Sequence, residues 1–149
     1  MELEGILKRA RRRPLFDPAG LDPTAAIGPE DVARLLPHRD PMLFVDSISA
    51  YDLDDELLAA NRWVDPAEPV FRGHFPGAPV YPGALLIETI GQASLCLQEL
   101  IVRREAGHGP GAEVAPHPLR LLRVRDAIFL QEVRPGDELT ILCQRLYHD

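Results

Sequence analysis

The sequence GHFPGAPVYPG occupies residues 73–83 and runs directly into the apolar stretch ALLI at residues 84–87. Six of its eleven residues are glycine or proline. Because proline fixes φ and glycine permits conformations that other residues avoid, this density predicts a rigid, specially shaped loop. The loop carries His74, and a single carboxylate, Glu88, follows soon after it. An imidazole and a carboxylate at the mouth of an apolar helix are the groups that proton transfer on an apolar substrate requires.

A long helix is predicted over residues 83–106, because Pro82 suits the start of a helix and Gly107 suits its end. Such a helix is about 35 Å long. Its first four turns are apolar on nearly every side, which indicates a helix enclosed by other structure. Its last turns carry charged residues that we expect to face solvent, namely Glu99, Arg103, Arg104 and Glu105.

The rest of the chain predicts strands around this helix, so the expected class is α+β, with one long central helix wrapped by a curved antiparallel sheet. A short helix is expected at residues 29–36, where a proline begins it and acidic residues fill its first turn. Turns are expected at residues 52–55 and 133–137, and a surface loop at residues 107–118. Strands are expected at residues 42–50, 56–64, 119–130 and 138–146.

The chain of 149 residues is long enough for one domain with a core that needs no metal or disulfide. Residues 1–28 are expected to form an N-terminal extension, flexible or helical, and residues 29–149 the folded domain. The cations clustered at residues 8–13 are interpreted as the solvated face of a short helix, with contact to an acidic partner or a membrane surface as the alternative. The net charge of −7 argues against nucleic acid as the main partner.

Cys96 and Cys143 lie in apolar segments without CxxC spacing, which favours buried free thiols in a reducing compartment. The N-terminus lacks an apolar secretory segment, and no apolar run approaches the ~20 residues of a membrane span, so we expect a cytoplasmic protein that makes no membrane contact. The histidines lack metal-ligand spacing, and the sequence has neither a GxSxG motif nor a Gly-rich phosphate loop. We therefore expect no metal and no cofactor.

The residues around the loop permit acid–base catalysis. Burial of Glu88 among its apolar neighbours would favour the protonated carboxyl, which could give its proton to a leaving hydroxyl. Gln92 lies one turn further on the same face and could hold Glu88 by a hydrogen bond. The first N–H groups of the helix, near Gly83, can stabilise negative charge on a carbonyl oxygen, with His74 as the base. The remaining histidines, His38, His108, His117 and His148, are interpreted as structural or exposed.

Three stretches, residues 35–46 (LLPHRDPMLFVD), 71–83 and 85–88, together with Gln92 and Ala93, carry a resemblance to a known family. They resemble the (3R)-hydroxyacyl-[acyl-carrier-protein] dehydratases of bacterial fatty-acid synthesis, which have the hotdog fold. The likeness covers about residues 29–146, with a weaker match at residues 133–139.

This resemblance implies dehydration of a (3R)-hydroxyacyl thioester to a trans-2-enoyl thioester, with His74 as the base and Glu88 as the acid. A glutamate at this position is typical of the branch that dehydrates without isomerising the product. The resemblance also implies that the Gly83 N–H polarises the thioester carbonyl. Supporting residues are expected at Gln92, Phe75 and Tyr81.

The same resemblance implies a homodimer, often assembled as a trimer of dimers, in which His74 of one chain faces Glu88 of the other. The substrate would arrive on an acidic acyl carrier protein, with its phosphopantetheine-linked acyl chain in an apolar tunnel between the protomers. Basic residues near the tunnel mouth would contact the carrier, unless they are ordinary surface charges. The candidates are Arg103, Arg104, Arg123 and Arg125.

Three features depart from the family pattern. Tyr81 stands where the family usually has methionine, which we expect to reshape the tunnel. The N-terminal extension is longer than usual, and the chain stops at Asp149, where family members continue for roughly two more strands. The last strands of the sheet are therefore expected to be missing. Two alternative functions stay open: a non-catalytic acyl-thioester-binding or partner subunit, and a hotdog acyl thioesterase, which would gain nothing from His74.

Overall fold

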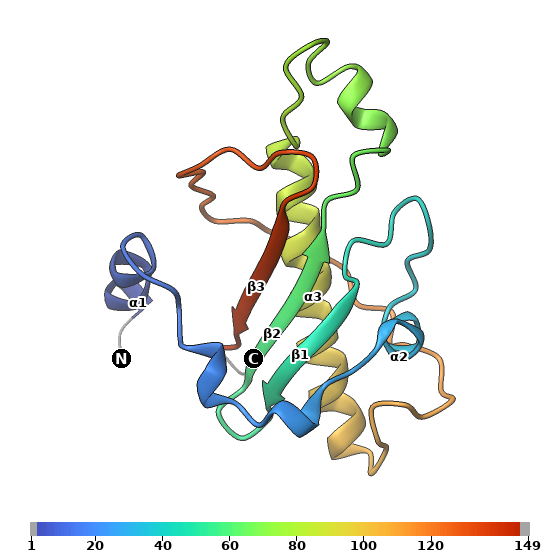
Figure 1. Ribbon diagram of the computed structural model, residues 1–149. Helices are drawn as coiled ribbons and strands as arrows, with labels where there is room; N and C mark the ends of the chain where they lie inside the picture. Colours follow the sequence, from blue (N-terminus) through green and yellow to red (C-terminus); the bar gives the residue numbers. More distant parts are fainter. Residues whose placement is uncertain (1–2, 147–149) are drawn as a thin grey trace.

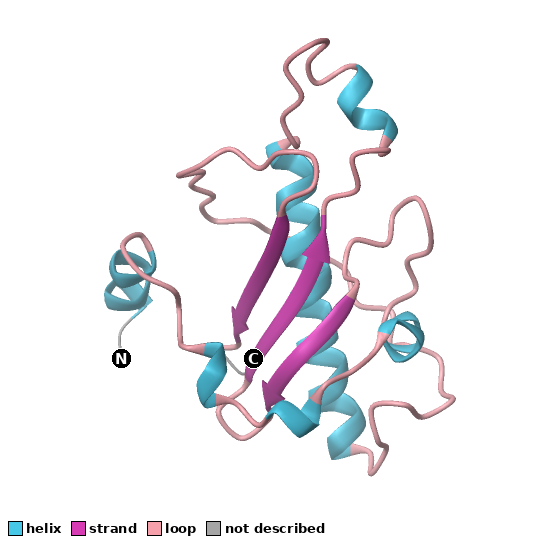
Figure 2. Cartoon of the chain, in the orientation of Figure 1, coloured by secondary structure: helices cyan, strands magenta, loops and turns pink. Residues whose placement is uncertain are grey.

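In the computed structural model, residues 3–146 are described, and one long helix lies against a small antiparallel sheet (Figure 1). Loops connect these elements and make up much of the remaining chain (Figure 2). Short 3₁₀ turns occur at Pro18–Gly20, Pro23–Ala25 and Pro69–Arg72. The helices and strands are α1 (Leu3–Ala10), α2 (Pro29–Leu35), β1 (Ser47–Asp52), β2 (Leu57–Trp63), α3 (Gly83–Glu105) and β3 (Glu138–Gln144).

The sheet has the order β1-β2-β3, with both pairings antiparallel. The hairpin formed by β1 and β2 confirms the expected strand–turn–strand unit around residues 52–55. On its other side β2 pairs with β3 over the full length of both strands, from Leu57 opposite Gln144 to Trp63 opposite Glu138. The architecture is therefore α+β, as predicted, and the sheet remains open.

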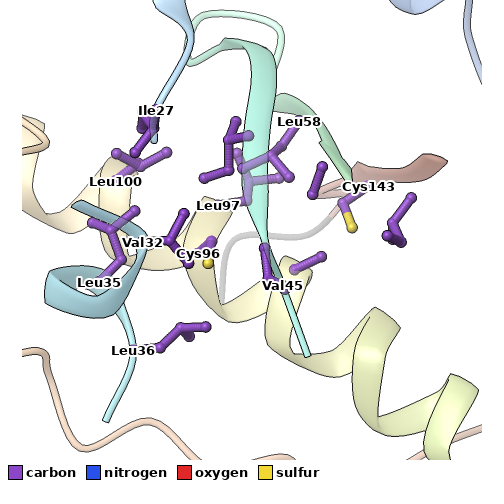
Figure 3. Close-up of a cluster of buried hydrophobic side chains, with 14 of the residues drawn as sticks. Ile27, Val32, Leu35, Leu36, Val45, Leu58, Cys96, Leu97, Leu100 and Cys143 are labelled. Carbon is purple, nitrogen blue, oxygen red and sulfur yellow. The ribbon is translucent and has the colours of Figure 1, made fainter. Parts of the chain in front are cut away.

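The core fills the space between the sheet, α3 and α2 (Figure 3). Leu58 and Ile48 reach it from the sheet, Val32 from α2 and Leu97 from α3, and all four are buried. Because truncating a buried leucine typically costs about 2–5 kcal/mol, Leu97 alone accounts for a large share of a domain's stability. Cys96 and Cys143 are also buried and free, which confirms their predicted state.

The predicted long helix is confirmed at both ends. Pro82 is the residue before α3, and its extended backbone suits that position. At the other end Gly107 has a φ of +77°, the N–H of Gly107 donates to the Arg104 carbonyl, and the N–H of His108 donates to the Arg103 carbonyl. These two bonds form a Schellman motif, which explains why the helix stops there.

By length and composition, α3 is the one helix within residues 3–146 that could cross a membrane, contrary to the expectation that no segment meets those criteria. The core helix of a globular domain passes the same test. Here the side chains of α3 pack against β2, β3 and α2, which is the arrangement of a core helix.

The first strand begins later than predicted, at Ser47 rather than near Met42. The reason is a side chain of α3. Gln92 donates a hydrogen bond from Nε2 to the Met42 carbonyl and accepts one at Oε1 from the Phe44 N–H. The backbone of this segment therefore satisfies its polar groups with a helix side chain instead of a neighbouring strand.

The strand predicted over residues 119–130 is wrong, because this segment forms no regular element and residues 120–132 are exposed. Leu122, for example, is 92% exposed. A strand is stable only when a neighbour pairs with its backbone, and β3 pairs with β2 on one side only. Within residues 3–146 no other strand reaches this segment.

The expected exposure along α3 is reversed at two charged positions. Glu99 and Arg103 were expected in solvent, yet each side chain is 1% exposed. Arg103 Nε donates to Glu99 Oε1, while its remaining nitrogens donate to main-chain carbonyls. Those carbonyls belong to Arg34, Pro110, Ala112 and Val114. Arg103 thus fastens the loop after α3 to α2.

The N-terminal extension contains α1, whose position away from the sheet is visible in Figure 1. Arg11 lies 3.6 Å from Asp126 in an exposed ion pair. The end of the extension is part of the domain, because Ile27 is buried and exchanges two backbone hydrogen bonds with Ile48.

Candidate active site

His74 is held by a tight loop that begins after the 3₁₀ turn Pro69–Arg72. The N–H of Ala78 donates to the Phe75 carbonyl, with Pro76 second in the turn and Gly77 third at a φ of +74°. These are the residues that a type II turn requires. The N–H of Val80 then donates back to the His74 carbonyl and closes the loop. The predicted rigid loop is therefore present, and its proline and glycine residues explain its shape.

The orientation of the His74 ring follows from one contact. His74 Nδ1 lies 2.7 Å from the Val80 carbonyl oxygen. A carbonyl oxygen only accepts hydrogen bonds, so Nδ1 carries the ring proton and Nε2 of the neutral ring keeps its lone pair. Phe75 stacks on the ring with the centroids 4.1 Å apart. The loop therefore presents Nε2 as the basic nitrogen.

Glu88 is held by Gln92, as predicted. Gln92 Nε2 donates to Glu88 Oε1 at 2.8 Å, and the contacts of Gln92 with Met42 and Phe44 fix which end of its amide is the donor. The Glu88 side chain is 32% exposed in the single chain. The burial of Glu88 that would favour its protonated form is only partial in the single chain, because its apolar neighbours are themselves only half-buried.

Gly83 begins α3, and within residues 3–146 its N–H makes no hydrogen bond, since the first bonded groups are those of Leu85 and Leu86. A Cβ at this position would lie 2.9 Å from the Phe129 ring, so glycine allows the ring to approach closely. Gly83 and His74 line one cavity of about 500 Å³, together with Tyr81 and Phe129. The candidate base and the candidate carbonyl-binding N–H therefore share a space.

Glu88 does not line that cavity, and no hydrogen bond or ion pair joins it to His74 within residues 3–146. The single chain thus brings together His74 with Gly83, and Glu88 with Gln92, as two separate pairs. A second cavity of about 550 Å³ lies beside the first and is lined mainly by apolar side chains of α3, β3 and the segment 121–131.

Tyr81 lines the His74 cavity, but most of its side chain packs against Val64 and Phe71 in a small second core. Burial raises the pKa of Tyr81, and the charges of Arg62 and Glu68 act on it in opposite directions. Tyr81 is therefore a buried residue of the cavity wall, and its side chain is not exposed to solvent.

The four candidate basic residues separate into two kinds. Arg103 is buried and bonded, so it is not available to a partner protein. Arg104 binds Asp54 and the Leu53 carbonyl at the surface. Arg123 and Arg125 are exposed in the segment after residue 119.

Sequence reasoning missed His38, which was interpreted as structural or exposed. Its Nε2 lies 3.5 Å from Glu88 Oε1. The only signal was its place in the stretch 35–46, and nothing there specifies a contact with α3. His117 is structural, as predicted, since its Nδ1 contacts Glu99 Oε2 at 2.9 Å. His108 is exposed, and His148 lies outside the described residues.

Comparison with known proteins gives a consistent result. The family model described as a FabA-like domain matches residues 36–145. A Chlamydia trachomatis protein named 3-hydroxyacyl-[acyl-carrier-protein] dehydratase FabZ is 40% identical over 115 residues, which cover 77% of this chain and 70% of that protein. Proteins of the same name are 38% identical in Chlamydia muridarum and 36% identical over 126 residues in Protochlamydia amoebophila. The chain therefore belongs to the FabA-like family of 3-hydroxyacyl-[acyl-carrier-protein] dehydratases, with its hotdog fold.

Proposed function

We propose that this protein removes water from (3R)-hydroxyacyl thioesters carried on acyl carrier protein, giving trans-2-enoyl thioesters in fatty-acid or related lipid or polyketide synthesis. The relatives named above support the reaction. The assignment of the base and the acid to residues rests on how the two side chains are hydrogen-bonded. His74 is fixed through Nδ1 with Nε2 left to accept a proton, and Glu88 is fixed through Oε1 with Oε2 left to donate one.

In the proposed step, His74 Nε2 takes the proton from C2 of the acyl chain. The C–H electron pair forms the C2–C3 double bond, the C3–O bond breaks, and Glu88 Oε2 protonates the departing oxygen to give water. The Gly83 N–H and the dipole of α3 stabilise the negative charge that develops on the thioester carbonyl oxygen. Each residue here has the role that the sequence predicted for it.

We propose further that the site is completed between two copies of the chain, with His74 from one protomer and Glu88 from the other. Two observations support this arrangement: no hydrogen bond or ion pair joins the two side chains within residues 3–146, and Glu88 is partly exposed. A homodimer would be the smallest active unit, and a trimer of dimers is compatible with it. The second copy would also supply the missing burial around Glu88.

The acyl chain is proposed to lie in the apolar cavity beside α3, where Leu86, Ile87 and Ile90 form one wall. Arg123 and Arg125 are exposed on the segment that forms the opposite side, and they are proposed to contact the acidic carrier protein. We also propose a cytoplasmic location. Residues 1–28 are proposed to extend a catalytic domain at residues 29–149, and Ile27 joins the end of this extension to the domain.

A spectrophotometric assay tests the function. The full chain is incubated with a 3-hydroxybutyryl or crotonyl thioester of acyl carrier protein, and enoyl absorbance is followed. Turnover is expected for the wild type, with a loss of about 10²–10⁴-fold in His74→Ala and no loss in the exposed control His108→Ala. Thioester binding without turnover would support the non-catalytic subunit instead, and release of free thiol would support the thioesterase.

A further inference from the structure

His38 has a partly buried imidazole ring, and the proposed reaction assigns no role to it. It follows α2 and places Nε2 3.5 Å from Glu88 Oε1, with 23% of its side chain exposed. Its other nitrogen, Nδ1, is buried and has no hydrogen-bond partner within residues 3–146. One ring nitrogen therefore faces the proposed acid, and the other faces a place with no acceptor.

This asymmetry determines which nitrogen carries the proton. A hydrogen on Nδ1 would be a buried donor without an acceptor, which is a costly arrangement, and it would turn the Nε2 lone pair towards a carboxyl oxygen. A hydrogen on Nε2 instead lies on the nitrogen that is 3.5 Å from Glu88 Oε1 and leaves only a lone pair unsatisfied. The neutral ring therefore carries its proton on Nε2, the opposite tautomer from His74.

The consequence concerns the two oxygens of Glu88. Oε1 receives an N–H from Gln92 and lies 3.5 Å from His38 Nε2, whereas Oε2 makes no hydrogen bond or ion pair within residues 3–146. An oxygen that accepts one N–H and lies 3.5 Å from a second is a poor place for the acid proton, so the proton of the carboxylic acid is directed to Oε2. His38 is the one titratable group at ion-pair distance from Glu88 in the described part of the chain.

We propose that His38 is a positioning residue of the dehydratase site: its Nε2–H holds Glu88 Oε1, directs the acid proton to Oε2 and stabilises the carboxylate left after proton donation. This inference rests on the proposed role of Glu88 as the acid. His38 need not touch the substrate, because it acts through Glu88. The same contact also ties the loop after α2 to the catalytic face of α3.

Two substitutions separate an N–H donor from a structural imidazole. In His38→Gln the side-chain amide nitrogen can occupy the place of Nε2, whereas in His38→Asn it can reach only the place of Nδ1. Because hydrogen bonds to charged groups are stronger than neutral ones, His38→Asn should lower kcat about 10- to 100-fold with little change in KM, and His38→Gln should keep kcat within about threefold. His108→Asn is the matched control and should keep wild-type kcat.

Equal losses in His38→Asn and His38→Gln, or no loss in either, would overturn the proposal. Thermal unfolding of each variant shows whether a loss of activity comes from unfolding.

A second measurement does not depend on turnover. It records the ¹⁵N chemical shifts of the histidine rings in the full chain, with the His38 signals identified by their absence from the His38→Gln spectrum. The expected result is a neutral ring protonated on Nε2, and a proton on Nδ1 would contradict the proposal. Wild-type protein without turnover would refute the proposed function, while the ring spectrum would still decide the contact.

Discussion

Two carboxylates on α3 have opposite surroundings, although they lie only about three helical turns apart. Glu99 is 1% exposed and both of its oxygens are engaged, Oε1 by Arg103 and Oε2 by the N–H and ring of His117. Glu88 is 32% exposed, and within residues 3–146 only its Oε1 has a hydrogen bond or an ion pair. A carboxylate with hydrogen bonds to both oxygens stabilises the structure. A carboxylate in which only one oxygen is hydrogen-bonded can transfer a proton through the other.

The comparison also explains why burial alone does not identify a functional residue. Burial raises the pKa of Glu99, but the hydrogen bonds from Arg103 and His117 outweigh that effect and hold the pKa below its ordinary value. Glu99 is thus kept as an anion by three donors, Arg103 Nε and the backbone N–H and ring Nδ1 of His117. The proposed acid needs the reverse condition, in which its proton is retained until the substrate arrives.

The largest effect on turnover is expected from substitution of Glu88. Glu88→Gln keeps the shape of the side chain but removes the transferable proton, so turnover of the hydroxyacyl thioester should fall about 10²–10⁴-fold. Its midpoint of thermal unfolding should stay close to that of the wild type, because Glu88 is partly exposed. Near-normal turnover in this variant would end the distinction between the two carboxylates.

Substitution of Glu99 should lower the stability of the protein instead of its turnover. Glu99→Gln leaves the buried Arg103 without its charged partner, and loss of one member of a buried pair costs about 3–5 kcal/mol. Urea unfolding measures this loss, with Glu113→Gln as an exposed control for the same chemical change. The folded fraction of Glu99→Gln should keep its turnover, and a specific loss of activity without a loss of stability would reverse the assigned roles.

A smaller effect is expected from pH. Because the pKa of Glu99 is lowered in the folded state from a reference value of 4.5, its contribution to stability is fully present above that pH. The contribution is lost as the pH falls through the lower folded value. Thermal unfolding followed from neutral to acidic pH should therefore show a steeper loss below pH 4.5 in the wild type than in Glu99→Gln. Parallel curves for the two proteins would show that Glu99 is not held as an anion.

The smallest effect concerns the thiol that lies between the two carboxylates on α3. Burial, with contributions from Cys143 and Glu99, raises the pKa of Cys96 to about 12. Since the thiolate is the reactive form, a soluble disulfide reagent should label neither cysteine in the folded protein and both in urea. Rapid labelling of the native protein would show that this part of α3 opens to solvent.

The sequence was sufficient to predict the loop around His74, the limits of α3 and the Gln92–Glu88 contact, because each depends on local chemistry or on helical spacing. It predicted the start of β1 wrongly, since the Gln92 amide that pairs with residues 42–44 comes from a distant helix. The strand expected at residues 119–130 failed because strand formation depends on a neighbouring strand. Glu99 and Arg103 were misplaced because charged residues at a helix end are usually solvated, and their partners lie in a loop with no sequence pattern.

Complementation between two inactive variants tests the central claim, that His74 and Glu88 meet across two copies of the chain. His74→Ala and Glu88→Gln are refolded together, and mixed dimers are isolated through two different affinity tags. If the residues come from different protomers, each mixed dimer holds one intact site, and an unselected mixture should regain up to about a quarter of wild-type turnover. Verified mixed dimers that remain inactive would contradict the account.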